Sequence, residues 1–598
     1  PGTGGDIAGR AIHAIPDNEF NALIPQEFWR EVVDRVAQEV PDTLLLAEAF
    51  WMMEGYFVRT LGMHRVYNSA FMNMLKNQEN QKYRMAIKNT LVFEPEILKR
   101  YVNFMNNPDE ETAITQFGDG FRYFSICTIL STLPGLPMFG HGQIEGFKEK
   151  YGMEYKRAYW NETPNDWIVE QHAKKIFPLL KKRYLFSGVE HFNIYDAYNN
   201  GAVEESIFAY ANGTDAEKTL VLVNNQYERT YGRIKTSAPK LKKNGEDSTQ
   251  VTVSLAENLG LSFGGRKFVI YENFSSGLTH LMPSIKLFEE GFEFTLDGYD
   301  SMVIWNIREV EDIDGNFEKL YNLIGNTGVR DINKAISLLR LKPLYKLIDN
   351  FRSDSFIKEI TAIVAGKAKS QNEKSLLLTI AECYTRLYAS FDSLSEPIKA
   401  QLLREPREIQ AKEMIKEIKQ LSTIFSQKAE DKVFVNYAGL ADALPLLLAI
   451  SIVIKPFIED DSTVLEAATL SDKLLLDSFY ENWGKDLELS ENELKRIVHS
   501  AAIFETVGKL VDLELSTDPI DILTDIFDNK VCKDYVNANE YQGTVWYNKE
   551  SMQQTILISA LSISIFNENN DKFNASEFVD TLLKAEAKAE YKLNKLIK

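Results

Sequence analysis

Apolar residues in the first third of the chain alternate between two patterns. Short unbroken apolar runs are followed by stretches whose apolar residues recur at helical spacing. Runs of the first kind are typical of strands buried on both faces of a parallel sheet. Residues 44–48 contain such a run, and we predict strands there and at residues 64–68, 101–105 and 136–139. The helices that join and follow them are predicted at 25–40, 69–91, 121–133 and 167–184.

The pattern changes twice further along. Short β-type runs, punctuated by glycine, asparagine and proline, predict an antiparallel sandwich. They lie at 206–210, 219–223, 267–271, 292–296 and 301–305. From about residue 311 apolar positions again follow helical spacing, and the apolar run 444–454 is too short to span a bilayer, which favours a core helix. The aromatic tract 541–546 is interpreted as packing, with a sugar-contacting surface as the alternative.

These patterns predict an α/β region, then a β region, then an α region. Four β/α units make half of an eightfold (β/α)8 barrel, the TIM-type fold. We therefore predict the C-terminal half of a barrel over 1–187, a β-sandwich over 188–307 and an all-helical region over 308–598. Half a barrel leaves two edge strands unpaired, so we expect a missing N-terminal barrel half upstream of residue 1.

Composition narrows the classes of partner. The 598 residues are 44% hydrophobic and 26% charged, as expected of globular protein. A formal charge of −19 disfavours nucleic acid and anionic membrane surfaces as partners. The three cysteines, Cys127, Cys383 and Cys532, are too far apart for a zinc site or a disulfide framework, so we predict buried thiols.

Two carboxylates stand at the ends of predicted strands. Glu48 ends the first strand and is followed by Trp51, while Asp109 follows the third. The carboxyl ends of parallel barrel strands share one rim, so both side chains are expected there, with Trp51 and Tyr67 as stacking surfaces. Glycoside hydrolysis needs carboxyl groups in different protonation states around one bond. This pattern favours a sugar-cleaving site, with a rim salt bridge as the alternative.

The order of the motifs resembles the α-amylase superfamily, glycoside hydrolase family 13. Residues 45–51 resemble its strand-five motif, 104–109 its strand-seven motif and 133–146 its strand-eight signature, and the β-rich stretch that follows resembles its C-terminal sandwich. The resemblance implies that Glu48 is the general acid/base and that Asp109 stabilises the transition state.

The chain departs from the family pattern at two places. Pro108 stands where the family usually has histidine, which removes a hydrogen-bond donor to the sugar. The strand-four motif with the nucleophilic aspartate is not found in the chain and is expected upstream of Pro1. Asn107 is expected either to contact substrate or to shape the turn.

The resemblance implies a retaining hydrolase acting on α-glucan or maltooligosaccharide. Two alternatives stay open: a glucan transferase or isomerase of the same superfamily, and a non-catalytic glucan-binding protein. No cofactor and no metal site is predicted, because His64 and His141 lack paired ligand spacing and are interpreted as hydrogen-bonded rim residues. We expect these 598 residues alone to hydrolyse nothing at a natural rate. No compartment is predicted.

Overall fold

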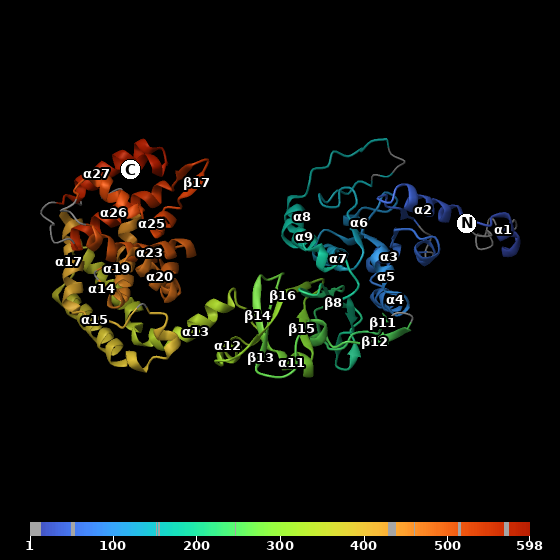
Figure 1. The fold of residues 1–598 in the computed structure, drawn as a ribbon, viewed down its shortest axis with the longest axis horizontal. Helices are drawn as coiled ribbons and strands as arrows, with labels where there is room; N and C mark the ends of the chain where they lie inside the picture. Colours follow the sequence, from blue (N-terminus) through green and yellow to red (C-terminus); the bar gives the residue numbers. More distant parts are fainter. Residues whose placement is uncertain are drawn as a thin grey trace. The chain divides into compact units, whose positions relative to one another are not determined.

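The protein folds into two compact units. The computed structural model describes residues 14–48, 54–150, 152, 156–244, 247–402, 404–427, 438–459, 461–511, 516–566 and 573–597. The first unit is Pro1–Ile336 and the second is Ser337–Lys598 (Figure 1). The predicted barrel half and β-sandwich both fall within the first unit, and the three-domain division stays a prediction.

A four-stranded parallel sheet opens the first unit, with its strands in chain order. The strands are β1 (Leu46–Ala47), β2 (Arg65–Tyr67), β3 (Tyr101–Phe104) and β4 (Leu136–Met138). Each lies within a predicted strand, although all are shorter than predicted. The helices before, between and after them are α1 (Asp17–Leu23), α2 (Phe28–Glu39), α3 (Ser69–Lys76), α4 (Asn80–Phe93), α5 (Glu96–Arg100), α6 (Ala113–Phe117), α7 (Phe121–Thr132), α8 (Asp166–Gln171) and α9 (Phe177–Lys181).

Two predicted helices are interrupted. The helix predicted over 69–91 divides into α3 and α4, because Gln78 takes a left-handed conformation with φ 55° that α-helix cannot contain. The helix predicted over 167–184 contains a π-helical turn, His172–Ile176, directly before Pro178 in α9. Proline cannot donate a backbone hydrogen bond, which is consistent with the widened turn before it.

Gly135 lets β3 and β4 approach each other. Its φ is +98°, and a Cβ at this position would lie 2.4 Å from the carbonyl oxygen of Tyr101. A side chain there would therefore clash with backbone and impose a conformation that L-residues avoid. Helix α7 ends at Thr132 and β4 begins at Leu136, so the helix predicted over 121–133 ends one residue early and Gly135 lies in the turn before the strand.

The rest of the first unit is mainly antiparallel β-structure. A six-stranded sheet has the order β14-β13-β16-β9-β8-β5, and a four-stranded sheet the order β15-β10-β6-β7. Their strands are β5 (Asn193–Tyr195), β6 (Tyr198–Asn199), β7 (Ala202–Val203), β8 (Ile207–Gly213), β9 (Lys218–Asn224), β10 (Thr230–Ile234), β13 (Lys267–Asn273), β14 (Leu278–Pro283), β15 (Phe292–Leu296) and β16 (Ser301–Glu311). A separate hairpin pairs β11 (Lys240–Asn244) with β12 (Asp247–Val251). The short helices of this part are α10 (Leu255–Asn258), α11 (Ser284–Glu289) and α12 (Asn316–Ile324).

One apolar cluster lies between these two antiparallel sheets. It contains Leu220, Leu222 and Ile304 from the larger sheet and Phe292 and Phe294 from the smaller one. Strand β16 pairs with β13 as far as Glu311, a few residues beyond the predicted end of the β region at 307.

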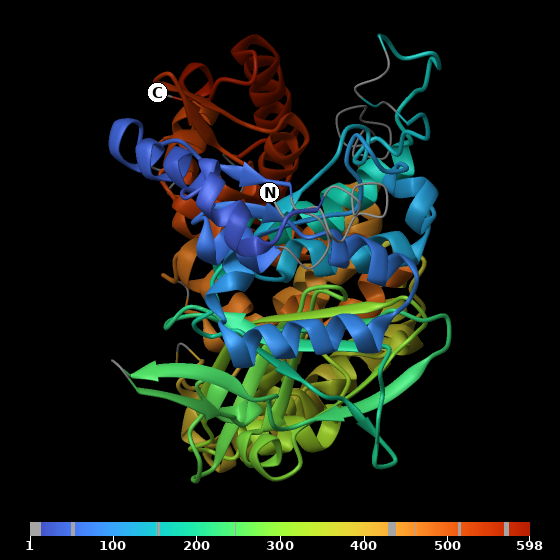
Figure 2. The same ribbon diagram turned by 90° about the vertical axis from the view of Figure 1, so that its right-hand side faces the viewer.

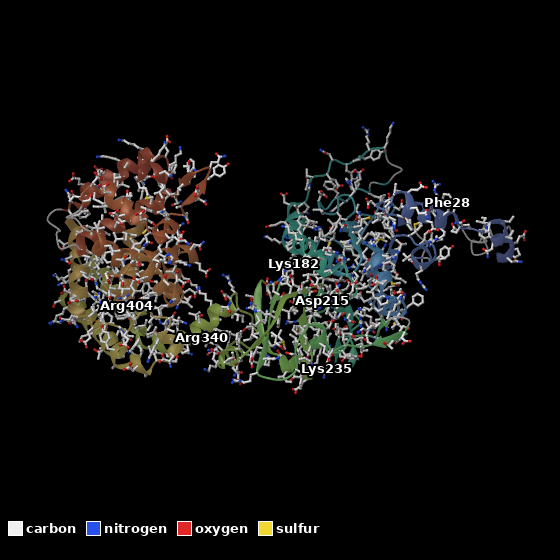
Figure 3. The ribbon with its side chains drawn as sticks, viewed as in Figure 1. Phe28, Lys182, Asp215, Lys235, Arg340 and Arg404 are labelled. Carbon is white, nitrogen blue, oxygen red and sulfur yellow. The ribbon has the colours of Figure 1, made fainter. Side chains whose placement is uncertain are left out.

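The core of the α/β part continues into the β part. Helix α7 is buried from Tyr123 to Thr132 and shares one apolar cluster with Tyr210 of β8 and Trp305 of β16. The hydroxyl groups of Thr132 and Tyr210 lie 2.6 Å apart within it. Lys182, which is labelled in Figure 3, lies at the edge of this contact. Its ammonium is 5.0 Å from the centre of the Trp305 ring and 3.6 Å from Glu217.

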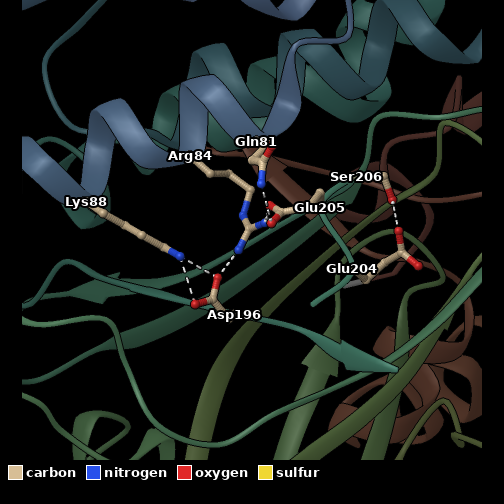
Figure 4. Close-up of polar contacts among 7 residues, drawn as sticks. All are labelled: Gln81, Arg84, Lys88, Asp196, Glu204, Glu205 and Ser206. Atoms are coloured by element: carbon tan, nitrogen blue, oxygen red, sulfur yellow. Dashed lines mark hydrogen bonds and ion pairs between the residues drawn. The ribbon is translucent and has the colours of Figure 1, made fainter. Parts of the chain in front are cut away.

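Charged residues fix α4 against the β part. The guanidinium of Arg84, 1% exposed, pairs with Asp196 and with Glu205, and Lys88 also binds Asp196 at 2.6 Å (Figure 4). The end of α4 lies alongside hairpin β11–β12 (Figure 2), where an ion pair joins Lys243 to Glu94 at 2.5 Å. Removing the buried cation would leave Asp196 paired with Lys88 only and Glu205 without a cationic partner among those shown in Figure 4.

The second unit is built from helices around one large apolar cluster. After α13 (Ile332–Leu347) its longer helices are α14 (Asp354–Val364), α15 (Ser370–Ser390), α17 (Ala411–Gln427), α19 (Ala438–Ile454), α20 (Val464–Lys473), α23 (Glu491–Leu510), α26 (Lys549–Phe566) and α27 (Ala575–Ala589). Shorter ones are α16 (Glu396–Lys399), α21 (Leu476–Phe479), α22 (Glu481–Asp486), α24 (Pro519–Phe527), α25 (Lys530–Tyr535) and α28 (Leu593–Leu596). The core helix predicted over 444–454 is confirmed as the buried part of α19.

The prediction of an all-helical C-terminal region is wrong at the tract 541–546. Strands β17 (Asn539–Tyr541) and β18 (Thr544–Trp546) form a hairpin there. Its two turn residues, Gln542 and Gly543, both have positive φ, as a tight hairpin turn requires. Within the described ranges no helix is both long and apolar enough to cross a membrane. All three cysteines are buried free thiols, as predicted.

Candidate functional site

The carboxyl ends of β1 to β4 and the loops that follow them form the carboxyl rim. Glu48 comes directly after β1, Tyr67 is the last residue of β2, and Asp109 lies in the loop after β3. Glu48 and Asp109 are exposed, whereas Tyr67 is half-buried. The three elements are neighbours in the parallel sheet, so their carboxyl ends point to the same edge.

Tyr67 lies within the electrostatic influence of both carboxylates. Burial is the main cause that raises the pKa of its hydroxyl above the ordinary value, and the negative charges of Glu48 and Asp109 raise it further. Its ring packs edge-on against Phe104 of β3, with 5.6 Å between the ring centres and 76° between their planes. The structure therefore brings Glu48, Tyr67 and Asp109 to one region of the carboxyl rim.

Asn107 shapes the loop that carries Asp109. Its side-chain oxygen accepts hydrogen bonds from the backbone N–H groups of Asp109 and Glu110, each at 3.0 Å. This is the turn role that asparagine often has before proline. The Lys150 ammonium donates to the backbone carbonyl of Asp109 at 2.8 Å, so the loop is held from both sides.

Buried amides lie beneath the rim, and the sequence analysis did not identify them. Asn68 donates to the side-chain oxygen of Asn103 at 2.8 Å, and Asn103 donates to the carbonyl of Pro134 at 3.2 Å. Asn68 also accepts from the backbone of Phe71 and caps α3. The network ties β2, β3 and the start of β4 together. Its signal in the sequence is a polar residue, Asn103, inside an otherwise apolar strand.

Asn106 is a second polar residue that sequence reasoning missed. It is 4% exposed, and its side-chain oxygen has no hydrogen-bond partner among the described residues. It lies against Gly140, where a Cβ would come within 2.5 Å of that oxygen. Glycine at 140 therefore lets the loops after β3 and β4 meet.

The loop after β4 is organised by Gln143 and by a buried pair, Tyr123 and His172. Gly140 donates its N–H to the Gln143 side chain at 3.1 Å, and the Tyr123 hydroxyl donates to the Gln143 carbonyl at 2.6 Å. His172 Nε2 lies 3.1 Å from the same hydroxyl. Since the tyrosine proton is already used, Nε2 carries the hydrogen and donates it.

Two further carboxylates fold the outer part of this loop. Glu162 accepts from the backbone N–H groups of Lys148 and Glu149, both at 2.8 Å. Glu149 in turn accepts from the N–H groups of Tyr159 and Trp160, at 2.7 and 2.9 Å. The Trp160 side chain is 58% exposed.

The remaining predicted residues are placed as follows. Trp51 lies outside the described residues. His64 accepts a hydrogen bond at Nδ1 from the backbone N–H of Leu45 at 3.0 Å, but it precedes β2 and so lies at the amino end of the sheet, not at the carboxyl rim. His141 is exposed on the loop after β4, with its ring 6.2 Å from that of Phe147. Among the described residues no group of three or more histidine, cysteine, aspartate or glutamate side chains is placed to hold a metal ion.

Comparison with known proteins gives matches among solved structures. No protein-family model matches the chain, and no curated protein matches it. The chain is similar to an α-amylase from Geobacillus thermoleovorans in complex with acarbose, with 15% identity, a TM-score of 0.33 and coverage of 47% of this chain and 57% of that one. A Nostoc punctiforme debranching enzyme soaked with acarbose has 15% identity and a TM-score of 0.33, with coverage of 46% of this chain and 53% of that one. An α-amylase from H. orenii has 16% identity and a TM-score of 0.31, with coverage of 49% of this chain and 59% of that one. The chain thus spans little more than half the length of these proteins.

Proposed function

We propose that this chain carries part of the active site of a retaining glycoside hydrolase that cleaves α-glucosidic bonds in α-glucan or maltooligosaccharide. Glu48 is the general acid/base and Asp109 the transition-state stabiliser. Tyr67, Trp51 and Asn107 are the proposed substrate contacts. The observation that carries the proposal is that Glu48 and Asp109 follow neighbouring strands at one edge of a parallel sheet and that both of their charges act on Tyr67.

The proposed reaction has two steps, each with balanced proton movement. A carboxylate nucleophile attacks the anomeric carbon while Glu48 gives its proton to the departing glycosidic oxygen. Glu48 then removes a proton from the water that displaces the nucleophile. Asp109 faces the positively charged sugar carbon in both transition states. The proposed nucleophile is an aspartate on a barrel strand upstream of residue 1.

The loop around Asp109 supports its proposed role. Asn107 holds the backbone of Asp109 through its side-chain oxygen, and Lys150 holds the carbonyl. Neither contact uses the carboxylate of Asp109. A stabilising carboxylate must be kept in place without being neutralised by a partner, and contacts that hold the loop through its backbone alone support that role.

The test replaces Glu48 by glutamine in the protein that includes the upstream barrel strands. General acid–base catalysis contributes about 10²–10⁴-fold, so kcat on natural glucans is expected to fall by at least that factor. Glu111→Gln, at an exposed carboxylate in the same loop as Asp109, is the matched control and should retain activity. Near-normal turnover by Glu48→Gln would contradict the assignment.

Product analysis separates hydrolysis from transfer. With maltooligosaccharide, a hydrolase gives shorter chains with new reducing ends, whereas a transferase or isomerase also gives longer or rearranged products. The non-catalytic alternative is favoured by Pro108, which stands where a sugar-binding histidine is expected. It predicts glucan binding without turnover even when the upstream strands are present.

A further inference from the structure

A pocket of about 290 Å³ lies in the β part of the first unit. Its walls come from β13 and β14 of the six-stranded sheet and from β15, the edge strand of the four-stranded sheet. The lining also includes Tyr231 of β10, Lys286 of α11, Met302 of β16 and Asn326, which follows α12. The volume is at the lower end of the range for ligand sites in proteins. The pocket uses none of the residues proposed for the carboxyl rim.

Aromatic rings form one wall of this pocket. Tyr271 and His280 are direct cross-strand partners, and their rings stack with 5.2 Å between centres and 6° between planes. Phe292 packs edge-on against Tyr271 at 5.9 Å. The apolar space beneath Tyr271 and Phe292 holds only about 10 Å³, no more than about one water molecule. A ligand is therefore confined to the mouth of the pocket.

Hydrogen-bonding groups also line the pocket or lie next to it. The Tyr231 hydroxyl donates to Glu293 at 2.9 Å, and Arg233, the cross-strand partner of Glu293, pairs with the same carboxylate. His280 donates from Nδ1 to the carbonyl of Asn326 at 3.2 Å. Asn273 and Thr295 also line the pocket and offer both donors and acceptors.

The charges of the lining nearly cancel. Among the described lining residues, Lys286 and Glu293 carry opposite formal charges, and burial lowers the pKa of His280, so its ring is neutral near pH 7. The lining therefore has no net charge that would attract a charged ligand. Flat aromatic faces beside amide, hydroxyl and carboxylate groups suit a neutral molecule that has both apolar C–H faces and many hydroxyl groups.

We propose that this pocket is a second saccharide-binding site, which takes one end of a neutral glucose chain at a place separate from the carboxyl rim. The aromatic wall packs against a sugar ring, while Glu293, Asn273 and Thr295 bind its hydroxyl groups. The choice of a glucose chain rests on the proposed function. The presence of a saccharide site in the β part rests on the pocket itself.

The experiment measures maltohexaose binding to the full 598-residue chain by titration calorimetry. Tyr231→Ala removes a hydroxyl and a ring that is 42% exposed, and Thr295→Arg places a long side chain in the pocket from an exposed position. Both variants should raise Kd at least tenfold. Tyr227→Ala, at a tyrosine that is 80% exposed in the same unit and does not line the pocket, should leave Kd unchanged.

Two features keep the outcome decisive. Thr295→Arg provides a second answer if Tyr231→Ala fails to fold, which thermal unfolding would reveal. Equal affinity in the unchanged chain and a folded pocket variant, or no binding at millimolar maltohexaose, would overturn the proposal. Binding of an extended peptide along the edge of β15 in place of the sugar would overturn it too.

The outcome is independent of the proposed catalytic role. Binding is measured without turnover. A Glu48→Gln variant that kept full activity would therefore contradict the proposed function, but it would not contradict a saccharide site that depends on Tyr231. Conversely, loss of turnover in Glu48→Gln together with unchanged maltohexaose binding in the pocket variants would contradict only the proposal of a second saccharide site.

Discussion

His172 and Tyr123 form a buried hydrogen bond, with 3.1 Å between Nε2 of the imidazole and the hydroxyl oxygen. The imidazole is fully buried, and its Nδ1 has no partner among the described residues. Burial lowers the pKa of His172 to about 4. Below the ordinary histidine pKa of about 6.5, the unfolded chain takes up a proton that the folded chain does not. The first unit should therefore lose stability as pH falls from about 6.5 to 4.

The size of this effect is on the order of 3 kcal/mol, because one pKa unit corresponds to about 1.4 kcal/mol. Urea unfolding between pH 7.5 and 4.5 measures it. His172→Gln keeps a hydrogen-bond donor but cannot titrate, so the variant should lose less stability over this range than the unchanged chain. Parallel pH profiles for the two proteins would contradict the assignment.

Glu417 in the second unit should have the opposite pH dependence. Its carboxylate binds Lys455 at 2.6 Å, yet burial and the nearby charge of Glu505 raise its pKa, outweighing the attraction of Lys455 and of Lys509. The folded chain then holds a proton that the unfolded chain has released, so stability falls as pH rises above about 4.3. Glu417→Gln should remove this loss, as measured by the difference in unfolding free energy at pH 5 and pH 8.

Replacing Arg84 should weaken the contact between α4 and the β part. Arg84→Met removes a buried cation and leaves Asp196 and Glu205 without it. Breaking a buried pair from one side costs about 3–5 kcal/mol, and the partial exposure of both carboxylates favours the lower figure. Arg229→Ala, at an ion pair with Asp297 that is about three-quarters exposed, should cost less than about 1 kcal/mol. Equal losses in the two variants would refute the structural role of Arg84.

Gly135→Ala should destabilise the parallel sheet. The added Cβ would meet the Tyr101 carbonyl at 2.4 Å, and φ is +98°. The backbone strain alone costs about 1–3 kcal/mol, and relieving the clash must move β3 away from β4. Gly55→Ala is the matched control, because its φ is helical and no atom lies within 4 Å. That change should be neutral or slightly stabilising in urea unfolding.

The positions of the parallel strands could be predicted because each contains a short, mainly apolar run between helical patterns, as in Leu44 to Ala47. The break between α3 and α4 at Gln78 could not be predicted, because a glutamine in the left-handed conformation leaves no trace in the pattern of apolar and polar residues. Hairpin β17–β18 was missed because Gln542 replaces the asparagine or glycine that usually marks such a turn.

The candidate site was predictable in its strand-end residues but not in its supports. Glu48, Tyr67 and Asp109 could be placed because strand ends lie on one edge of a parallel sheet. The contacts between Asn68 and Asn103, and between His172 and Tyr123, join side chains that are distant in the sequence, so no local pattern shows them. The pocket at Tyr271 likewise needs the register of two antiparallel strands.

The two outer strands of the parallel sheet affect how the protein should be handled. β1 and β4 each pair on one side only within the part of the chain that the structure describes. Unpaired strand edges recruit other chains. Preparations of these 598 residues should therefore be checked for concentration-dependent oligomers by light scattering before any kinetic or binding constant is assigned to a monomer.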